Sequence, residues 1–195
     1  MADDALSRRG HALEDQYFRN KDQQLIEKMR QAGAADQARR DLSEKTGIDD
    51  PEMLQELQAL GFTPATAILL PLVPVVQMAW ADGRAAPAER TLVVELARSR
   101  GIVEGSAADG LLSEWLARQP GPQVFASAAR LIRAMLAAHA SDHHPDLTAD
   151  DLVQHCERIA AASGGIFGIN RISAEERALL TTIAAGLKAE RKAGG

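Results

Sequence analysis

The sequence predicts an all-α protein, and three observations carry that prediction. Apolar residues recur at helical spacings of three or four, and no segment shows sustained alternation of apolar and polar residues. Capping residues followed by proline precede several of these apolar blocks, and glycines follow them, as is typical of helix starts and stops. Aromatic residues make up only 4% of the 195 residues, so the helices must pack through Leu, Ile, Val and Ala.

Residues 1–61 are predicted to form a charged N-terminal helical arm. Between its charged residues, large apolar side chains recur at helical spacing: Leu6, Leu13, Tyr17, Phe18, Leu25, Ile26 and Met29. This pattern predicts a long amphipathic helix with a narrow apolar stripe. A second, short helix is expected from Ala35 to Lys45, and a third opens at Asp50-Pro51 and stops at Gly61. The stripe should pack on the body, on a protein partner, or on its own copy in a homo-oligomer.

Residues 62–190 are predicted to form the helical body. Its first helix follows Thr63-Pro64 and contains Pro71 and Pro74, which predict a kink or a break because each removes a backbone donor. Further starts and stops predict the remaining helices, at Pro87 to Arg100, from Ser106 to before Pro120, Pro122 to about Ala140, from Thr148, and from Ser173. Ser173 and Glu176 are expected to form a capping box at the start of the last helix.

Composition and charge limit the location and the kinds of partner that are expected for the protein. The apolar run from Ala65 to Ala81 is shorter than the roughly 20 residues of a membrane span and contains two prolines, so it is expected to be a buried core helix and not a transmembrane segment. A net charge of -5 argues against nucleic acid as the main partner. Cys156 is the single cysteine, which excludes an internal disulfide, and the acidic N-terminus lacks an apolar signal core. A cytoplasmic location is expected.

The most informative motif is Asp82-Gly83 followed, after five residues, by Glu89. It has the spacing of the second half of an EF-hand loop, but Met78 and Trp80 stand where the first ligands would be and cannot bind calcium. A standard EF-hand is therefore excluded. Asp82 is expected at a helix C-terminus, where a negative charge is disfavoured by about 0.3–1 kcal/mol. Arg84, Arg90, loop amides or a cation could compensate it.

A second copy of this pattern lies near the C-terminus. Aligned without gaps, Arg84 to Ala97 and Arg171 to Ala184 share five residues, including the pair Glu89 and Glu176. The body is therefore expected to consist of two pseudo-symmetric helical halves. Two interpretations of the glutamates stay open: both stabilise the first turns of their helices, or Asp82, Glu89 and Glu176 together hold a divalent cation, the one cofactor that the sequence suggests.

Ala81-Asp82-Gly83 with Glu89-Arg90, and more weakly Ser163-Gly164-Gly165 with Glu176-Arg177, resemble the tellurite-resistance TerB-like domain. The resemblance covers residues 62–188. It implies an all-helical domain, acidic turns that bind divalent metal, and a non-catalytic interaction or scaffold module linked to stress response and membrane-associated systems. A peripheral contact with a membrane complex is compatible with it. In the second turn, glycines replace the Asp-Gly of the family.

For the other residues that could bind a metal or a phosphate or act as a nucleophile, the sequence favours a structural role. A histidine-rich stretch is expected to be a solvent-exposed loop; its candidate ligands are His139, His143, His144 and Asp146. Asp142 and Pro145 suggest that the helix has ended there, so the helical spacing that a zinc site would need is lost. The glycine-rich segment 164–168 lacks the Gly-Lys-Ser/Thr ending of a phosphate loop. Cys156 lies on an apolar helix face and is expected to be an inert buried thiol. No catalytic motif is present, so an enzyme is not expected.

Overall fold

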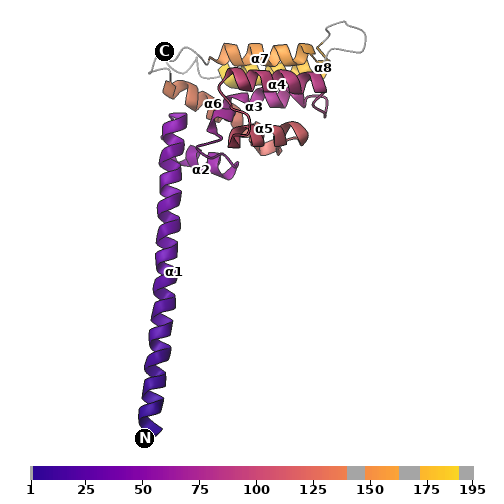
Figure 1. The fold of residues 1–195 in the computed structure, drawn as a ribbon. Coiled ribbons are helices and arrows are strands. Elements are labelled where there is room, and N and C mark those ends of the chain that lie inside the picture. Colours follow the sequence, from indigo (N-terminus) through magenta and orange to yellow (C-terminus); the bar gives the residue numbers. More distant parts are fainter. Residues whose placement is uncertain (1, 140–147, 163–171, 189–195) are drawn as a thin grey trace. The chain divides into compact units, whose positions relative to one another are not determined.

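The computed structural model describes residues 2–139, 148–162 and 172–188, with side chains described from Arg19 onward except that of His139. Within these ranges the backbone forms α-helices and one 3-10 helix and no strand, which confirms the all-α prediction (Figure 1). The chain comprises two compact units, Met1–Asp41 and Leu42–Gly195.

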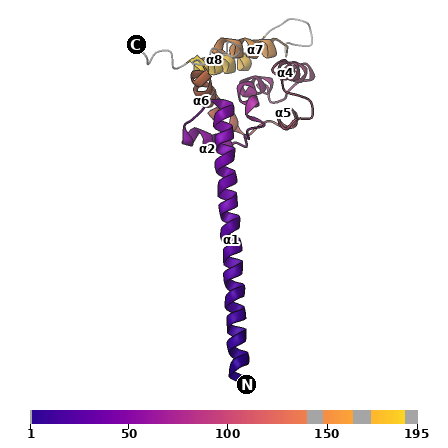
Figure 2. The same cartoon turned by 60° about the vertical axis from the view of Figure 1, so that its left-hand side comes forward.

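The first unit consists of most of α1 (Ala2–Thr46), one continuous helix of 45 residues (Figures 1 and 2). The prediction of a separate helix from Ala35 to Lys45 is therefore wrong. Gly33 lies inside the helix, where glycine costs about 1 kcal/mol relative to alanine, and no proline follows it within α1. Side-chain pairs three or four residues apart support the helix on both sides of Gly33, including Gln31 with Glu27 and Gln37 with Asp41.

The second unit begins earlier than the sequence predicted, at Leu42 and not at residue 62. The reason is burial: four large apolar residues before residue 62 belong to the hydrophobic core, namely Leu42, Ile48, Leu54 and Leu57. In addition, Glu56 of α2 (Pro51–Ala59) accepts hydrogen bonds from Ser127 and Arg130 of α6 (Pro122–His139). The last turn of α1 and the whole of α2 therefore belong with the body.

The centre of the body is α3 (Val73–Ala79), which follows the 3-10 helix η1 (Ala67–Leu72). The change of helix type near Pro71 and Pro74 confirms the predicted break. Every residue of α3 except Gln77 is buried, and the helix contacts η1 and the α-helices α4 (Pro87–Ser99), α6, α7 (Ala149–Ala162) and α8 (Ala174–Lys188). The apolar run is thus core, as predicted, and no helix in the described ranges is long and apolar enough to span a membrane.

The contacts of four helices follow the predicted internal repeat. In this repeat, α7 corresponds to α3 and α8 corresponds to α4. The contact between α3 and α4 then corresponds to the contact between α7 and α8, and the contact between α4 and α7 corresponds to the contact between α8 and α3. Residues Pro87 and Ala174, 87 positions apart, start the corresponding helices α4 and α8. Outside this exchange, α5 (Ala107–Ala117) packs on η1, and α6 packs on η1, α3 and α8.

Candidate functional site

We call the three predicted cation ligands, Asp82, Glu89 and Glu176, the acidic corner. Glu89 is the third residue of α4. Its side chain is only 2% exposed, and its Oε2 accepts a hydrogen bond of 2.6 Å from the backbone N–H of Ala86, which precedes the helix. Glu89 thereby satisfies a donor that the helix start leaves unpaired. Ala86 has no side-chain oxygen to return the bond to the first turn, so only half of a capping box is present.

Glu176 occupies the same position in α8. It is 4% exposed, and its Oε2 accepts a 2.6 Å hydrogen bond from the backbone N–H of Ser173. Here the box is complete, because the backbone N–H of Glu176 donates to Ser173 Oγ at 3.0 Å. The predicted capping box at Ser173 is therefore confirmed.

The two glutamates and Asp82 influence one another electrostatically. The pKa of Glu89 is raised from 4.5 to about 7, first because burial removes the carboxylate from water, and further because Asp82 and Glu176 carry like charges nearby. The hydrogen bond from Ala86 and the charge of Arg84 oppose the rise without cancelling it. Glu89 is thus a buried carboxylic acid that holds its proton up to about neutral pH.

Asp82 lies in the turn after α3, beside Gly83, whose φ of 88° is left-handed. One carboxylate oxygen accepts a hydrogen bond of 3.1 Å from the backbone N–H of Arg84, and the other lies 3.8 Å from Arg84 Nε. Arg90 does not pair with it and instead donates to the carbonyl of Ala85. The disfavoured charge of Asp82 is therefore compensated by Arg84 and its amide.

The side chains of the acidic corner are not arranged as a preformed metal site. In the described part of the chain, no three His, Cys, Asp or Glu side chains are grouped so that they could hold a metal ion. Asp82 is exposed, whereas Glu89 and Glu176 are buried and each accepts a bond from the amide at its helix start. The arrangement can bind a proton at Glu89. Coordination of a cation would require the glutamates to give up those amide bonds.

Several other predicted candidates lie outside the described residues. These are His143, His144 and Asp146, the glycine-rich segment 164–168, and the side chain of His139. Cys156 is described: it is fully buried, and burial raises the pKa of its thiol to about 12. The prediction of a buried thiol is confirmed.

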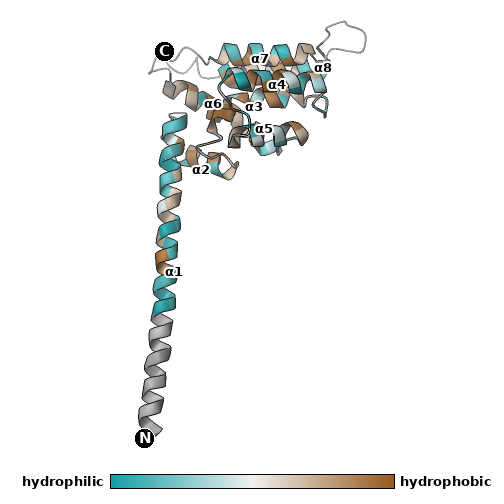
Figure 3. Cartoon of the chain, in the orientation of Figure 1, coloured by the Kyte–Doolittle hydropathy of each residue, from teal (hydrophilic) through white to brown (hydrophobic). Residues whose placement is uncertain are grey.

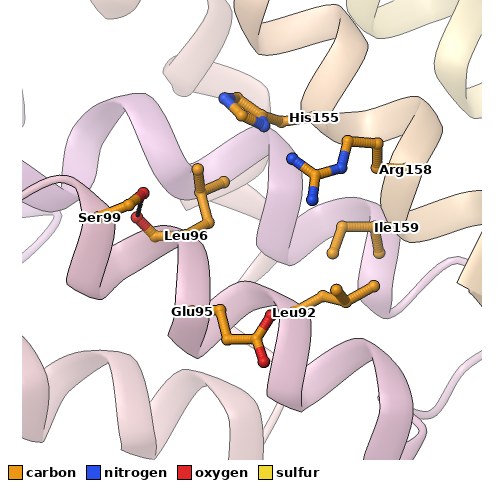
Figure 4. A pocket seen from close by; sticks show the side chains of 7 residues that line it. All are labelled: Leu92, Glu95, Leu96, Ser99, His155, Arg158 and Ile159. Atoms are coloured by element: carbon orange, nitrogen blue, oxygen red, sulfur yellow. Dashed lines mark hydrogen bonds between the residues drawn. The ribbon is translucent and has the colours of Figure 1, made fainter.

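Sequence reasoning missed a groove between α4 and α7 with a volume of about 230 Å³. Leu92, Leu96 and Ile159 form its apolar lining (Figure 4). Its polar lining comes from Glu95 and Ser99 of α4 and from His155 and Arg158 of α7. A signal was present in the i,i+4 pairing of Glu95 with Ser99, but nothing in the sequence places those residues opposite α7, about 60 residues later.

The arm presents a second unpredicted detail, the exposure of its described large apolar residues to solvent. Every described side chain from Arg19 to Gln37 is exposed, and three of them are large and apolar: Leu25 is 57% exposed, Ile26 49% and Met29 67%. In the coloured part of α1, Figure 3 shows brown turns among mainly teal ones. We call Leu25, Ile26 and Met29 the arm patch.

Comparison of the chain with protein-family models, curated proteins and solved structures gave no match.

Proposed function

We propose that the protein is a non-catalytic, TerB-like interaction or scaffold module, and that its arm associates with the arm of a second copy. The observation that carries this proposal is the arm patch. Leu25 and Met29 are four residues apart and share a helix face, and Ile26 flanks them. A helix that is otherwise charged has no need of three exposed large apolar side chains for its own folding, whereas a contact between helices uses such a group.

The size of the patch sets the expected affinity. Burying a whole large aliphatic side chain contributes about 1.5–3 kcal/mol, so covering these half-exposed ones contributes roughly 1 kcal/mol each, or about 6 kcal/mol for two copies. Association itself costs at least about 4 kcal/mol. The resulting complex is weak, and its population rises with concentration. A scaffold of this kind assembles only where the chain is locally concentrated, which fits a module recruited to a stress-response or membrane-associated complex.

Differently tagged copies of the full chain test the proposal. After brief chemical cross-linking at high concentration, capture of one tagged copy should retain the other, and the variant Leu25→Gln/Ile26→Gln/Met29→Gln should abolish retention while its helix content stays unchanged. Val103→Asn is the matched control, because Val103 is a large apolar residue of the body that is 69% exposed. Retention that survives the triple substitution, or that fails equally in the control, argues against the arm as the contact.

We propose as a second candidate that the acidic corner senses a divalent cation through Asp82, Glu89 and Glu176. The observation that favours it is the mutual repulsion of these carboxylates, which a cation would relieve. Thermal melting of the chelator-treated chain with calcium, magnesium or zinc tests it, since a ligand that binds only the folded state raises Tm. Asp82→Asn should remove the shift, and Asp150→Asn, an exposed carboxylate of α7, should leave it intact. A flat response to all three metals eliminates this candidate.

A further inference from the structure

The groove between α4 and α7 combines an apolar surface with charged groups at its rim. Ile159 is 2% exposed and lies within the core, while Leu92 and Leu96 are half-buried. An adjoining hollow shares Leu96, Ser99 and His155 and adds Arg100 to the lining. The two hollows therefore form one continuous feature along the facing sides of α4 and α7.

Positive charge dominates the α7 side of this groove. The pKa of His155 is lowered, first by burial and then by the positive charges of Arg100 and Arg158, and only Asp151 opposes this. His155 is thus a neutral imidazole at pH 7, with one nitrogen that donates and one that accepts. No described carboxylate lies within ion-pair distance of Arg158, so its guanidinium faces the groove with its donors available (Figure 4).

The α4 side carries one negative charge and one hydroxyl. Glu95 is exposed at the rim and is not paired with Arg158, although both line the same groove. Ser99 donates its hydroxyl proton to the carbonyl of Leu96 at 2.8 Å, so its oxygen remains available as an acceptor. A ligand with a second negative charge would approach Glu95 and be repelled by it.

We propose that this groove binds a small aliphatic monocarboxylate, with the carboxylate on Arg158 and the hydrocarbon body on Leu92, Leu96 and Ile159. The guanidinium matches a carboxylate because its planar N–H groups can donate two parallel hydrogen bonds. His155 supplies a neutral hydrogen-bond donor beside Arg158. The volume of about 230 Å³ is below the usual range for drug-sized ligands and suits a branched acid of a few carbon atoms.

Isovalerate is the probe, titrated into the full chain and followed by the methyl NMR signals of Leu92, Leu96 and Ile159. These signals should shift and saturate at millimolar ligand. Isovaleramide, which has the same shape without the charge, should bind at least about tenfold more weakly, because the charge-assisted bonds to Arg158 are lost. Succinate should also bind more weakly than isovalerate, and Glu95→Gln should narrow that difference.

Arg158→Gln should weaken isovalerate binding at least about tenfold. Arg118→Gln is the matched control, since Arg118 is an exposed arginine at the end of α5, outside the groove lining. Equal shifts with isovalerate and isovaleramide, an unchanged affinity in Arg158→Gln, or no shift at these three residues would each overturn the proposal.

The same carboxylate chemistry could be presented by a free acid or by the C-terminus of a protein. N-acetyl-alanyl-leucine and its C-terminal amide separate the two sources. Tighter binding of the dipeptide acid than of isovalerate, lost in the amide, assigns the groove to a protein C-terminus. Tighter binding of isovalerate assigns it to a free acid.

Discussion

Glu89 and Glu176, 87 residues apart, occupy the same position in two helices of the body and lie within electrostatic reach of each other. Each is the third residue of its helix, each is almost fully buried, and each accepts a 2.6 Å hydrogen bond from the backbone N–H that precedes the helix. The charge of Glu176 contributes to the raised pKa of Glu89. The internal repeat thus brings together two glutamates that stabilise their own helix starts while repelling each other.

The raised pKa of Glu89 predicts that stability falls as pH rises. The folded chain holds the Glu89 proton up to about pH 7, whereas the unfolded chain releases it near the ordinary value of 4.5. The contribution of this group to stability is therefore complete below about 4.5 and is lost as pH rises through 7. Melting temperatures measured from pH 5 to 8 should decline by several degrees.

Glu89→Gln should flatten this decline and melt above the parent chain at pH 8, because the amide stays neutral and can still accept the bond from Ala86. Glu95→Gln, at an exposed position of the same helix, should keep the parent profile. A decline that persists unchanged in Glu89→Gln would assign the pH dependence to other groups.

The incomplete capping box of α4 predicts a stabilising substitution. Ala86 has φ of -68° and ψ of 156°, close to the backbone of Ser106, which caps α5 with its hydroxyl. Ala86→Ser should therefore add about 1 kcal/mol to the free energy of unfolding, and Ser173→Ala should remove about as much from α8. Ala88→Ser, one residue past the helix start, is the control and should not stabilise. Chemical denaturation measures all three.

Close packing of α6 on α8 predicts that Gly186 cannot accept a branched side chain. A Cβ built on Gly186 would lie 3.2 Å from the Cβ of Ala129. Gly186→Val should lower the free energy of unfolding by about 1–3 kcal/mol, because further methyl groups force the helices apart. Ala185→Val, at the exposed neighbouring position, should cost less than half as much. Equal losses in the two variants would show that helix propensity alone is responsible.

Burial of Cys156 predicts a thiol that is silent until the body unfolds. Its pKa of about 12 leaves almost no thiolate at pH 8, and the sulfur is fully buried. A thiol-specific chromogenic reagent should give no fast reaction with the native chain and one thiol per chain in denaturant. Ser113→Cys, at an exposed position of α5, should add one fast-reacting thiol. A rapid reaction of the unmodified native chain would contradict the packing of α7.

Local patterns in the sequence predicted the features that depend on neighbouring residues. Ser173 and Glu176 form the expected capping box, and Pro71 and Pro74 mark the expected break, because both effects operate within one turn of chain. The continuity of α1 was missed, since a separate helix was expected from Ala35, whereas Gly33 and Ala35 both lie within one helix. The inclusion of Leu42 and Leu57 in the core was also missed, because charged neighbours give that stretch the composition of the arm.

The α4–α7 groove could not be predicted, since it depends on which helix faces which. Nothing local distinguishes His155 and Arg158 from exposed polar residues of an amphipathic helix. The acidic corner was predictable in part: the equivalence of Glu89 and Glu176 follows from the repeat, and Arg84 was among the expected partners of Asp82. The burial of both glutamates depends on how the helices pack and was not predicted.

The central claim is that the arm patch joins copies of this chain, and sedimentation equilibrium over a wide concentration range tests it most directly. The account predicts an average mass that starts near the 20.9 kDa of one chain and rises measurably above it at the highest concentrations, as expected of a weak self-association. The Leu25→Gln/Ile26→Gln/Met29→Gln variant should stay at the mass of one chain throughout. A parent chain that keeps the mass of one chain at the highest concentration would contradict the claim.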